Sequence, residues 1–88
     1  MAMNDVLMKA VLESIAFAEL SDDETIDSHA AVTHLETIAY ILHELNPSER
    51  EAFCTFADSL AAEEERQAGP SARVDLFRST AVTLGWRE

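Results

Sequence analysis

A three-residue step in the middle of the chain, Leu45-Asn46-Pro47, constrains the fold more than any other stretch. Asn46 is a favoured helix N-cap, because its side-chain oxygen can accept from the free amides of a first helical turn. Pro47 suits the first helical position, where no amide donor is needed, and Glu49 occupies the capping-box position. Because proline disfavours helical backbone at the residue before it, a preceding helix must end there. The step therefore predicts two helices joined by a tight corner.

Hydrophobic periodicity extends this pattern to the whole chain. It predicts an all-α protein, a compact four-helix bundle, with helices at about 4–20, 28–45, 47–67 and 71–84. Gly69-Pro70 separates the last two helices, and Trp86 after the final helix is expected to fold back onto the bundle. The chain has only two glycines and two prolines, which argues against a loop-rich or all-β fold. Residues 1–88 are expected to form a single helical domain.

Two of the expected helices carry broad apolar faces. The first helix has one wide apolar face. Beside it lies a second apolar edge of Val6, Ala10 and Phe17, and together they leave little of the helix surface for water. Such a helix is expected to be central in the bundle or to be covered by a second copy in a homodimer. In the second helix an apolar stripe is expected to form the core-facing side. The stripe comprises Ala31, Val32, Leu35, Ile38, Ala39, Ile41, Leu42 and Leu45.

Composition indicates the cellular compartment of the protein. The hydrophobic fraction of 48% is enough for a packed core and excludes a wholly disordered chain. A single cysteine cannot form an internal disulfide, which is typical of a reducing compartment. The first twenty residues mix acids with apolar residues, unlike a signal peptide, and no apolar run reaches the roughly 18–20 residues of a membrane span. We therefore expect a cytoplasmic protein with no membrane partner.

Charge is the strongest compositional signal. Seventeen acids against six lysines and arginines give a net charge of −11. Residues 1–69 contain fifteen of the acids and three of the basic residues. Such a field repels nucleic-acid phosphates and anionic membranes and attracts cationic surfaces. The charge predicts a basic protein partner and no direct nucleic-acid binding, the plainer alternative being an acidic surface that serves only solubility.

Two patterns suggest metal sites, and neither has the required spacing. The linker over residues 22–27 is rich in acids, but it lacks the central glycine and the late bidentate glutamate of an EF-hand loop. On the second helix His29, Glu36 and His43 are seven residues apart, whereas a helical metal pair needs a spacing of three or four. No metal site is expected.

One tripeptide resembles a cofactor attachment site. Asp58-Ser59-Leu60 reproduces the Asp-Ser-Leu of acyl carrier proteins, in which the serine carries phosphopantetheine at the start of the second helix. Here Ser59 falls inside the continuous helix expected over 47–67, late in the chain and with no long helix after it. The likeness stops at three residues, so no cofactor is expected.

No catalytic triad, nucleophile–base pair or phosphate-binding glycine loop is recognisable, so we do not expect an enzyme. By size, charge and helical content the chain is similar in type to the small acidic immunity proteins and antitoxins of bacteria, which neutralise basic toxins. Two other classes stay open: a homodimeric adaptor or secretion chaperone that associates through the first helix, and a nucleic-acid mimic. The candidate partner-binding residues are Asp22, Asp23, Glu24, Asp27, Glu36, Tyr40, His43 and Glu44.

Overall fold

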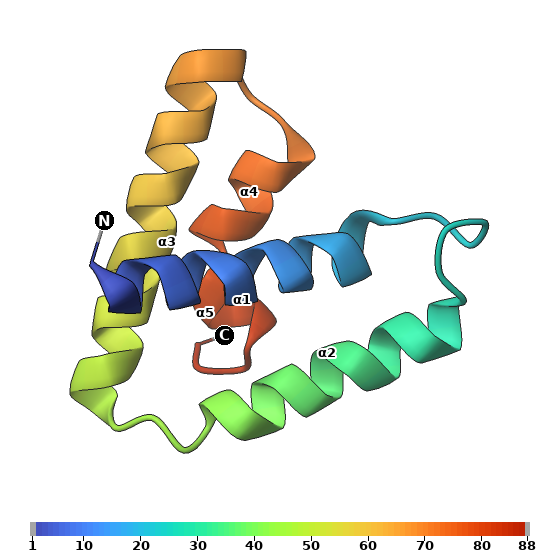
Figure 1. Cartoon of the computed structure of the whole chain (residues 1–88), viewed down its shortest axis with the longest axis horizontal. Helices are drawn as coiled ribbons and strands as arrows, with labels where there is room; N and C mark the ends of the chain where they lie inside the picture. The colour runs from blue at the N-terminus through green and yellow to red at the C-terminus, as the bar shows by residue number, and fades with distance from the viewer. Residues whose placement is uncertain (1, 88) are drawn as a thin grey trace.

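The computed structural model describes residues 2–87 and confirms an all-α helical bundle (Figure 1). The helices are α1 (Met3–Leu20), α2 (Ser28–Leu42), α3 (Pro47–Ala68), α4 (Ala72–Arg78) and α5 (Thr80–Thr83). No strand occurs within residues 2–87. The first three helices begin and end within three residues of the predicted bounds, whereas the predicted fourth helix is divided in two.

Helix α1 is the central element. It contacts α2, α3 and α4, while the short α5 contacts α3 and α4 (Figure 1). The closest pairing of the bundle is between α3 and α4, and α1 lies across both. Helix α2 is different, because its backbone approaches only that of α1. The bundle is therefore a packed α1–α3–α4 unit with α2 attached along one side.

The core forms where α1, α3 and α4 meet. Leu12 and Ile15 of α1 are buried against the same cluster as Ala57 of α3 and Val74 and Phe77 of α4. Ala57 and Ala61, one turn apart on α3, are fully buried, and their small side chains let α4 approach α3 closely. The wide face predicted for the first helix is thus confirmed as core in its central part.

Trp86 packs back onto this core, as the sequence predicts. Its ring lies edge-on to that of Phe53, with the centroids 6.0 Å apart, in the T-shaped arrangement that aromatic pairs favour. The guanidinium of Arg50 lies over the Trp86 ring in a cation–π contact, with its Cζ atom 5.4 Å from the ring centroid. The C-terminal turn is therefore tied to the beginning of α3.

The corner at Asn46 has the predicted capping box. The Oδ1 atom of Asn46 accepts from the Glu49 amide at 2.8 Å, and Glu49 Oε1 accepts from the Asn46 amide at 2.9 Å. Both orphan donors at the start of α3 are satisfied reciprocally. At the other end of α3, Gly69 has a φ of 81°, a value that favours glycine and ends the helix.

The prediction that the second helix continues to residue 45 is wrong, because α2 ends at Leu42. The side chain of Arg50 explains the early end. Its Nη2 donates to the His43 carbonyl at 2.8 Å, and its Nε donates to the Leu45 carbonyl at 3.0 Å. Because these carbonyls find donors on α3, residues 43–45 leave the helix in a turn without losing hydrogen bonds.

The prediction of one continuous helix over 71–84 is also wrong. The backbone departs from helical geometry at Ser79, whose φ of −103° and ψ of 23° separate α4 from α5. The Ser79 hydroxyl donates to the Asp75 carbonyl at 2.7 Å, and the Thr80 hydroxyl donates to the Phe77 carbonyl at 2.7 Å. Two adjacent hydroxyls therefore compete with backbone amides for the helical carbonyls, and the helix turns where they do so.

The capping box yields a stability prediction. Asn46→Ala should lower the free energy of unfolding by about 1 kcal/mol, because the Glu49 amide loses its acceptor. Pro47→Ala should have a milder effect. Chemical denaturation followed by circular dichroism measures both, with Ser48→Ala, an exposed position of the same first turn, as the control. An Asn46→Ala protein as stable as Ser48→Ala would contradict a stabilising cap.

Candidate functional site

The apolar stripe of α2 is only partly covered, contrary to the prediction that it lies in the core. Ala31 is its one fully buried member among the described residues, whereas Val32 and Ile41 are exposed. The reason is geometric. A helix that packs against a single neighbour can bury only the narrow line of side chains facing that neighbour. The outward half of α2 is therefore available to a partner.

Tyr40 dominates this outward half. Its side chain is 79% exposed, the largest value among the exposed large hydrophobic side chains of the structure. Glu36 lies one turn before it on the same face of α2, and Glu44 follows it in the turn after the helix ends, so a carboxylate stands on each side of Tyr40 along the chain. His43 is also exposed, and Arg50 Nη2 lies 3.4 Å from its Nδ1. We call Glu36, Tyr40, His43 and Glu44 the Tyr40 cluster.

The acidic linker between α1 and α2 holds the other four predicted contact residues. Asp22 Oδ1 accepts from the amide and the hydroxyl of Thr25, each at 3.0 Å, and the hydroxyl bond is the main cause that lowers the pKa of Asp22. Asp27 Oδ2 caps α2 by accepting from the Ala30 amide at 3.1 Å. Asp23 and Glu24 are exposed at the tip. Two of the four acids thus organise the linker itself.

The structure separates these eight residues into two groups. The linker acids lie at the N-terminal end of α2, and the Tyr40 cluster lies at or near its C-terminal end (Figure 1). The helix between them spans roughly 20 Å at 1.5 Å per residue. One partner surface could contact both groups only by lying along the whole outer face of α2.

A second exposed surface lies on α1. Met3, Val6, Leu7, Ala10 and Phe17 are all exposed along one side of this helix, and we call them the open α1 face. Beside it is a hollow of about 280 Å³ between α1 and α2. The hollow is lined by Ala10, Val11, Ser14, Ile38, Ile41 and Leu42. The second apolar edge of Val6, Ala10 and Phe17 is the sequence signal for this face, but sequence alone does not say whether another helix of the chain covers it.

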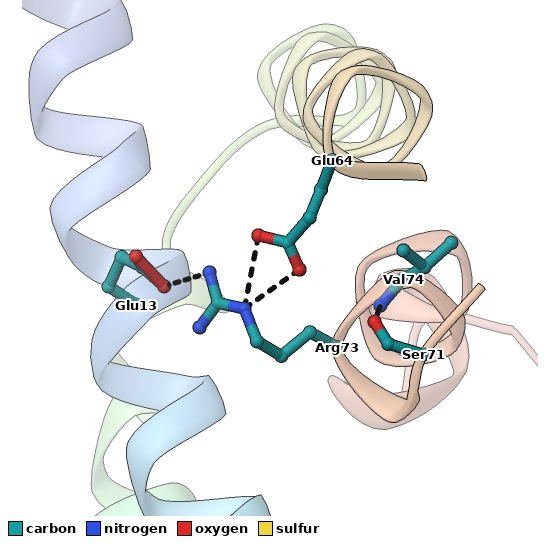
Figure 2. A network of polar contacts seen from close by, with 5 residues as sticks. All are labelled: Glu13, Glu64, Ser71, Arg73 and Val74. Carbon is teal, nitrogen blue, oxygen red and sulfur yellow. Dashed lines mark hydrogen bonds and ion pairs between the residues drawn. The ribbon is translucent and has the colours of Figure 1, made fainter. Parts of the chain in front are cut away.

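The most connected charged group has a structural role. Arg73 of α4 reaches Glu64 of α3, with an Nε–Oε2 distance of 2.8 Å, and Glu13 of α1, with an Nη2–Oε1 distance of 2.7 Å (Figure 2). The hydrogen bond to Glu64 is the main cause that raises the pKa of Arg73 above its ordinary value. Ser71 starts the same helix by accepting from the Val74 amide at 3.2 Å. This network joins three helices. A separate polar contact joins the Ser14 hydroxyl of α1 to Nε2 of His34 on α2, 2.9 Å apart.

Other reactive side chains are engaged or inert. Burial raises the pKa of the Cys54 thiol, an effect that nearby Asp58 reinforces and Arg87 opposes. Ser59 lies mid-helix and donates to the Thr55 carbonyl at 3.1 Å. Among residues 2–87, no three histidines, cysteines, aspartates or glutamates are grouped to hold a metal ion. The described part of the chain therefore offers surfaces for contact more clearly than it offers groups for chemistry.

Comparisons of the chain with protein-family models, with curated proteins and with solved structures find no match. Within the described residues, no helix has both the length and the apolar character needed to cross a bilayer. Function must therefore be argued from the two exposed surfaces and the distribution of charge.

The environment of Cys54 predicts its reactivity. Since only the thiolate reacts with alkylating reagents, a raised pKa should make Cys54 of the folded protein slower than free cysteine toward iodoacetamide at pH 8. The rate should continue to increase above pH 9, because burial holds the pKa of the Cys54 thiol above its ordinary value. Unfolding in guanidinium provides the control, because it should restore the rate of a free peptide thiol. A native rate equal to or above the unfolded rate would show an activated thiol instead.

Proposed function

We propose that this protein is a non-enzymatic cytoplasmic protein that binds a basic protein partner through the outer face of α2. The observation that carries the proposal is the Tyr40 cluster, in which an almost fully exposed tyrosine is flanked by Glu36 and Glu44. Tyrosine supplies large amphipathic contact area with little conformational freedom to lose, which suits it to the centre of an interface.

The distribution of charge supports a cationic partner. Residues 21–45, which comprise the linker and α2 with the turn that follows it, contain six acids and no lysine or arginine. The arginines of the α3–α4 half are largely paired within the chain. Arg78 binds Glu65 at 3.0 Å, Arg66 binds Glu63, and Arg73 binds Glu64 and Glu13. The uncompensated negative charge therefore concentrates on α2 and its linker, where it would steer a basic surface toward Tyr40.

The proposed class is an immunity protein or antitoxin of bacterial type, which would neutralise a basic toxin by covering its cationic cleft. A small rigid helical unit suits this role, because little ordering is needed when it docks. Asp23 and Glu24 at the linker tip would reach the edge of the cleft, and Tyr40 would be the anchor about one helix length away. Charge would set the association rate, and the aromatic contact would set the lifetime of the complex.

Affinity capture from native-host lysate tests this function. The immobilised protein should retain one predominant basic protein at low salt and release it as the salt concentration rises, because exposed charges are screened. Tyr40→Ala should weaken the interaction at least about tenfold, the effect of losing a hot-spot side chain. The purified partner and calorimetry would give the affinities.

Three matched variants make the same test specific for position. Glu36→Gln and Glu44→Gln remove charge beside Tyr40, and Glu51→Gln removes the same charge from an exposed position on α3. The first two should slow association, and the third should leave it unchanged. Recovery of no protein at low salt, or equal capture by the wild-type and Tyr40→Ala proteins, would contradict the proposed function.

A further inference from the structure

We infer that the open α1 face is the contact between two copies of this chain, which associate with their α1 helices antiparallel across a twofold axis near Ala10. This surface is distinct from the Tyr40 cluster on α2, so the inference is independent of the proposed basic partner. A second copy of the chain would cover the face. Three observations support that choice: the composition of the face, its internal symmetry and the exposed area of the chain.

The face carries no charge in a strongly charged protein. None of its five residues is acidic or basic, although the chain has a net charge of −11. A basic partner would be expected to meet carboxylates among the apolar contacts, as it would on α2. A second copy of an acidic chain instead needs a surface from which carboxylates are excluded, since like charges in contact are strongly unfavourable.

The face is arranged symmetrically along α1. Met3, Ala10 and Phe17 are spaced by seven residues, so they lie on one line of the helix. In an antiparallel pair centred on Ala10, Met3 of one copy lies opposite Phe17 of the other and Val6 lies opposite Ser14. Leu7 lies opposite Glu13, whose charge is paired with Arg73 of its own chain. Each such contact occurs twice, which is the property of an isologous interface. The small side chains at the centre allow the two helices to approach closely.

The hollow between α1 and α2 completes the fit. Its α1 wall includes Ser14, which is level with Val6 of the second copy, and Ala10, which is level with Ala10 of the second copy. Its volume of about 280 Å³ has room for an aliphatic side chain from the second copy. Ile41 lies across the hollow on α2 and is itself exposed, so α2 would add apolar contact to the interface.

The chain exposes more area than a compact monomer of its mass. The structure exposes 5848 Å², whereas a compact monomer of 9.7 kDa exposes about 5,100 Å² by the area–mass relation. The excess, roughly 700 Å², is close to the roughly 800 Å² that each partner buries in a standard interface. Apolar side chains on α1 and α2 contribute to this excess, as expected for a surface that is covered in the assembled protein.

Light scattering coupled to size-exclusion chromatography at micromolar concentration tests the dimer. The wild-type protein should have about twice the 9.7 kDa mass of one chain. Its dissociation constant, measured by analytical ultracentrifugation, should decrease as the salt concentration rises, because salt screens the repulsion between two acidic chains. Binding of a basic partner should show the opposite salt dependence, so the two proposals can fail separately.

Two valines provide the matched variants. Val6 on α1 and Val82 on α5 are 50% and 52% exposed, so a glutamate at either site adds the same charge with similar loss of burial. Val6→Glu should weaken the dimer at least about tenfold, because each dimer would bury two carboxylates. Val82→Glu should not change the dissociation constant beyond the general effect of one added charge. Circular dichroism checks that both variants fold, and Phe17→Ser serves as a second α1 variant.

A monomeric wild-type mass at both low and high salt would overturn the inference, as would equal weakening by Val6→Glu and Val82→Glu. A monomeric Val6→Glu protein that still captures the basic partner would support a dimer contact separate from the α2 surface.

Discussion

The close contact between α3 and α4 is the interaction on which the rest of the structure depends. Buried alanines on α3 allow Val74 and Phe77 of α4 to join the core, and Arg73 ties both helices to α1 through Glu64 and Glu13. Helix α1 lies across this pair and buries Leu12 and Ile15 there. Only the remaining sides of α1 are then left for α2, which explains why α2 has one helical neighbour and a half-covered apolar stripe.

This hierarchy divides the molecule into two halves. The α3–α4 half contains most of the paired arginines and the core, so its charges are largely balanced internally. The α1–α2 half contains the acids of the linker and of α2, the exposed Tyr40 and the open α1 face. If both proposals hold, a dimer through α1 would present two outward-facing α2 helices and could bind two basic partners. Raising the salt concentration would strengthen the first contact and weaken the second.

Local sequence signals predicted the elements well where the stabilising contacts are local. The capping box of Asn46 and Glu49, and the helix end at Gly69, depend on residues within one turn of each other. The early end of α2 depends on Arg50, which reaches back across the corner to carbonyls five and seven residues away. The break at Ser79 depends on which of several hydroxyls competes with the backbone, and propensity alone does not decide this.

The sequence by itself determined that the chain is helical, where its central corner lies and that α2 with its linker has acids but no lysine or arginine, because periodicity, capping and charge are properties of neighbouring residues. Only the tertiary structure decided which apolar faces are used up in the core. Periodicity marks Leu12 and Val6 alike as apolar, yet one is buried and the other half-exposed. The difference arises from the position of α3 and α4 against one side of α1, and that arrangement depends on contacts between residues far apart in the chain.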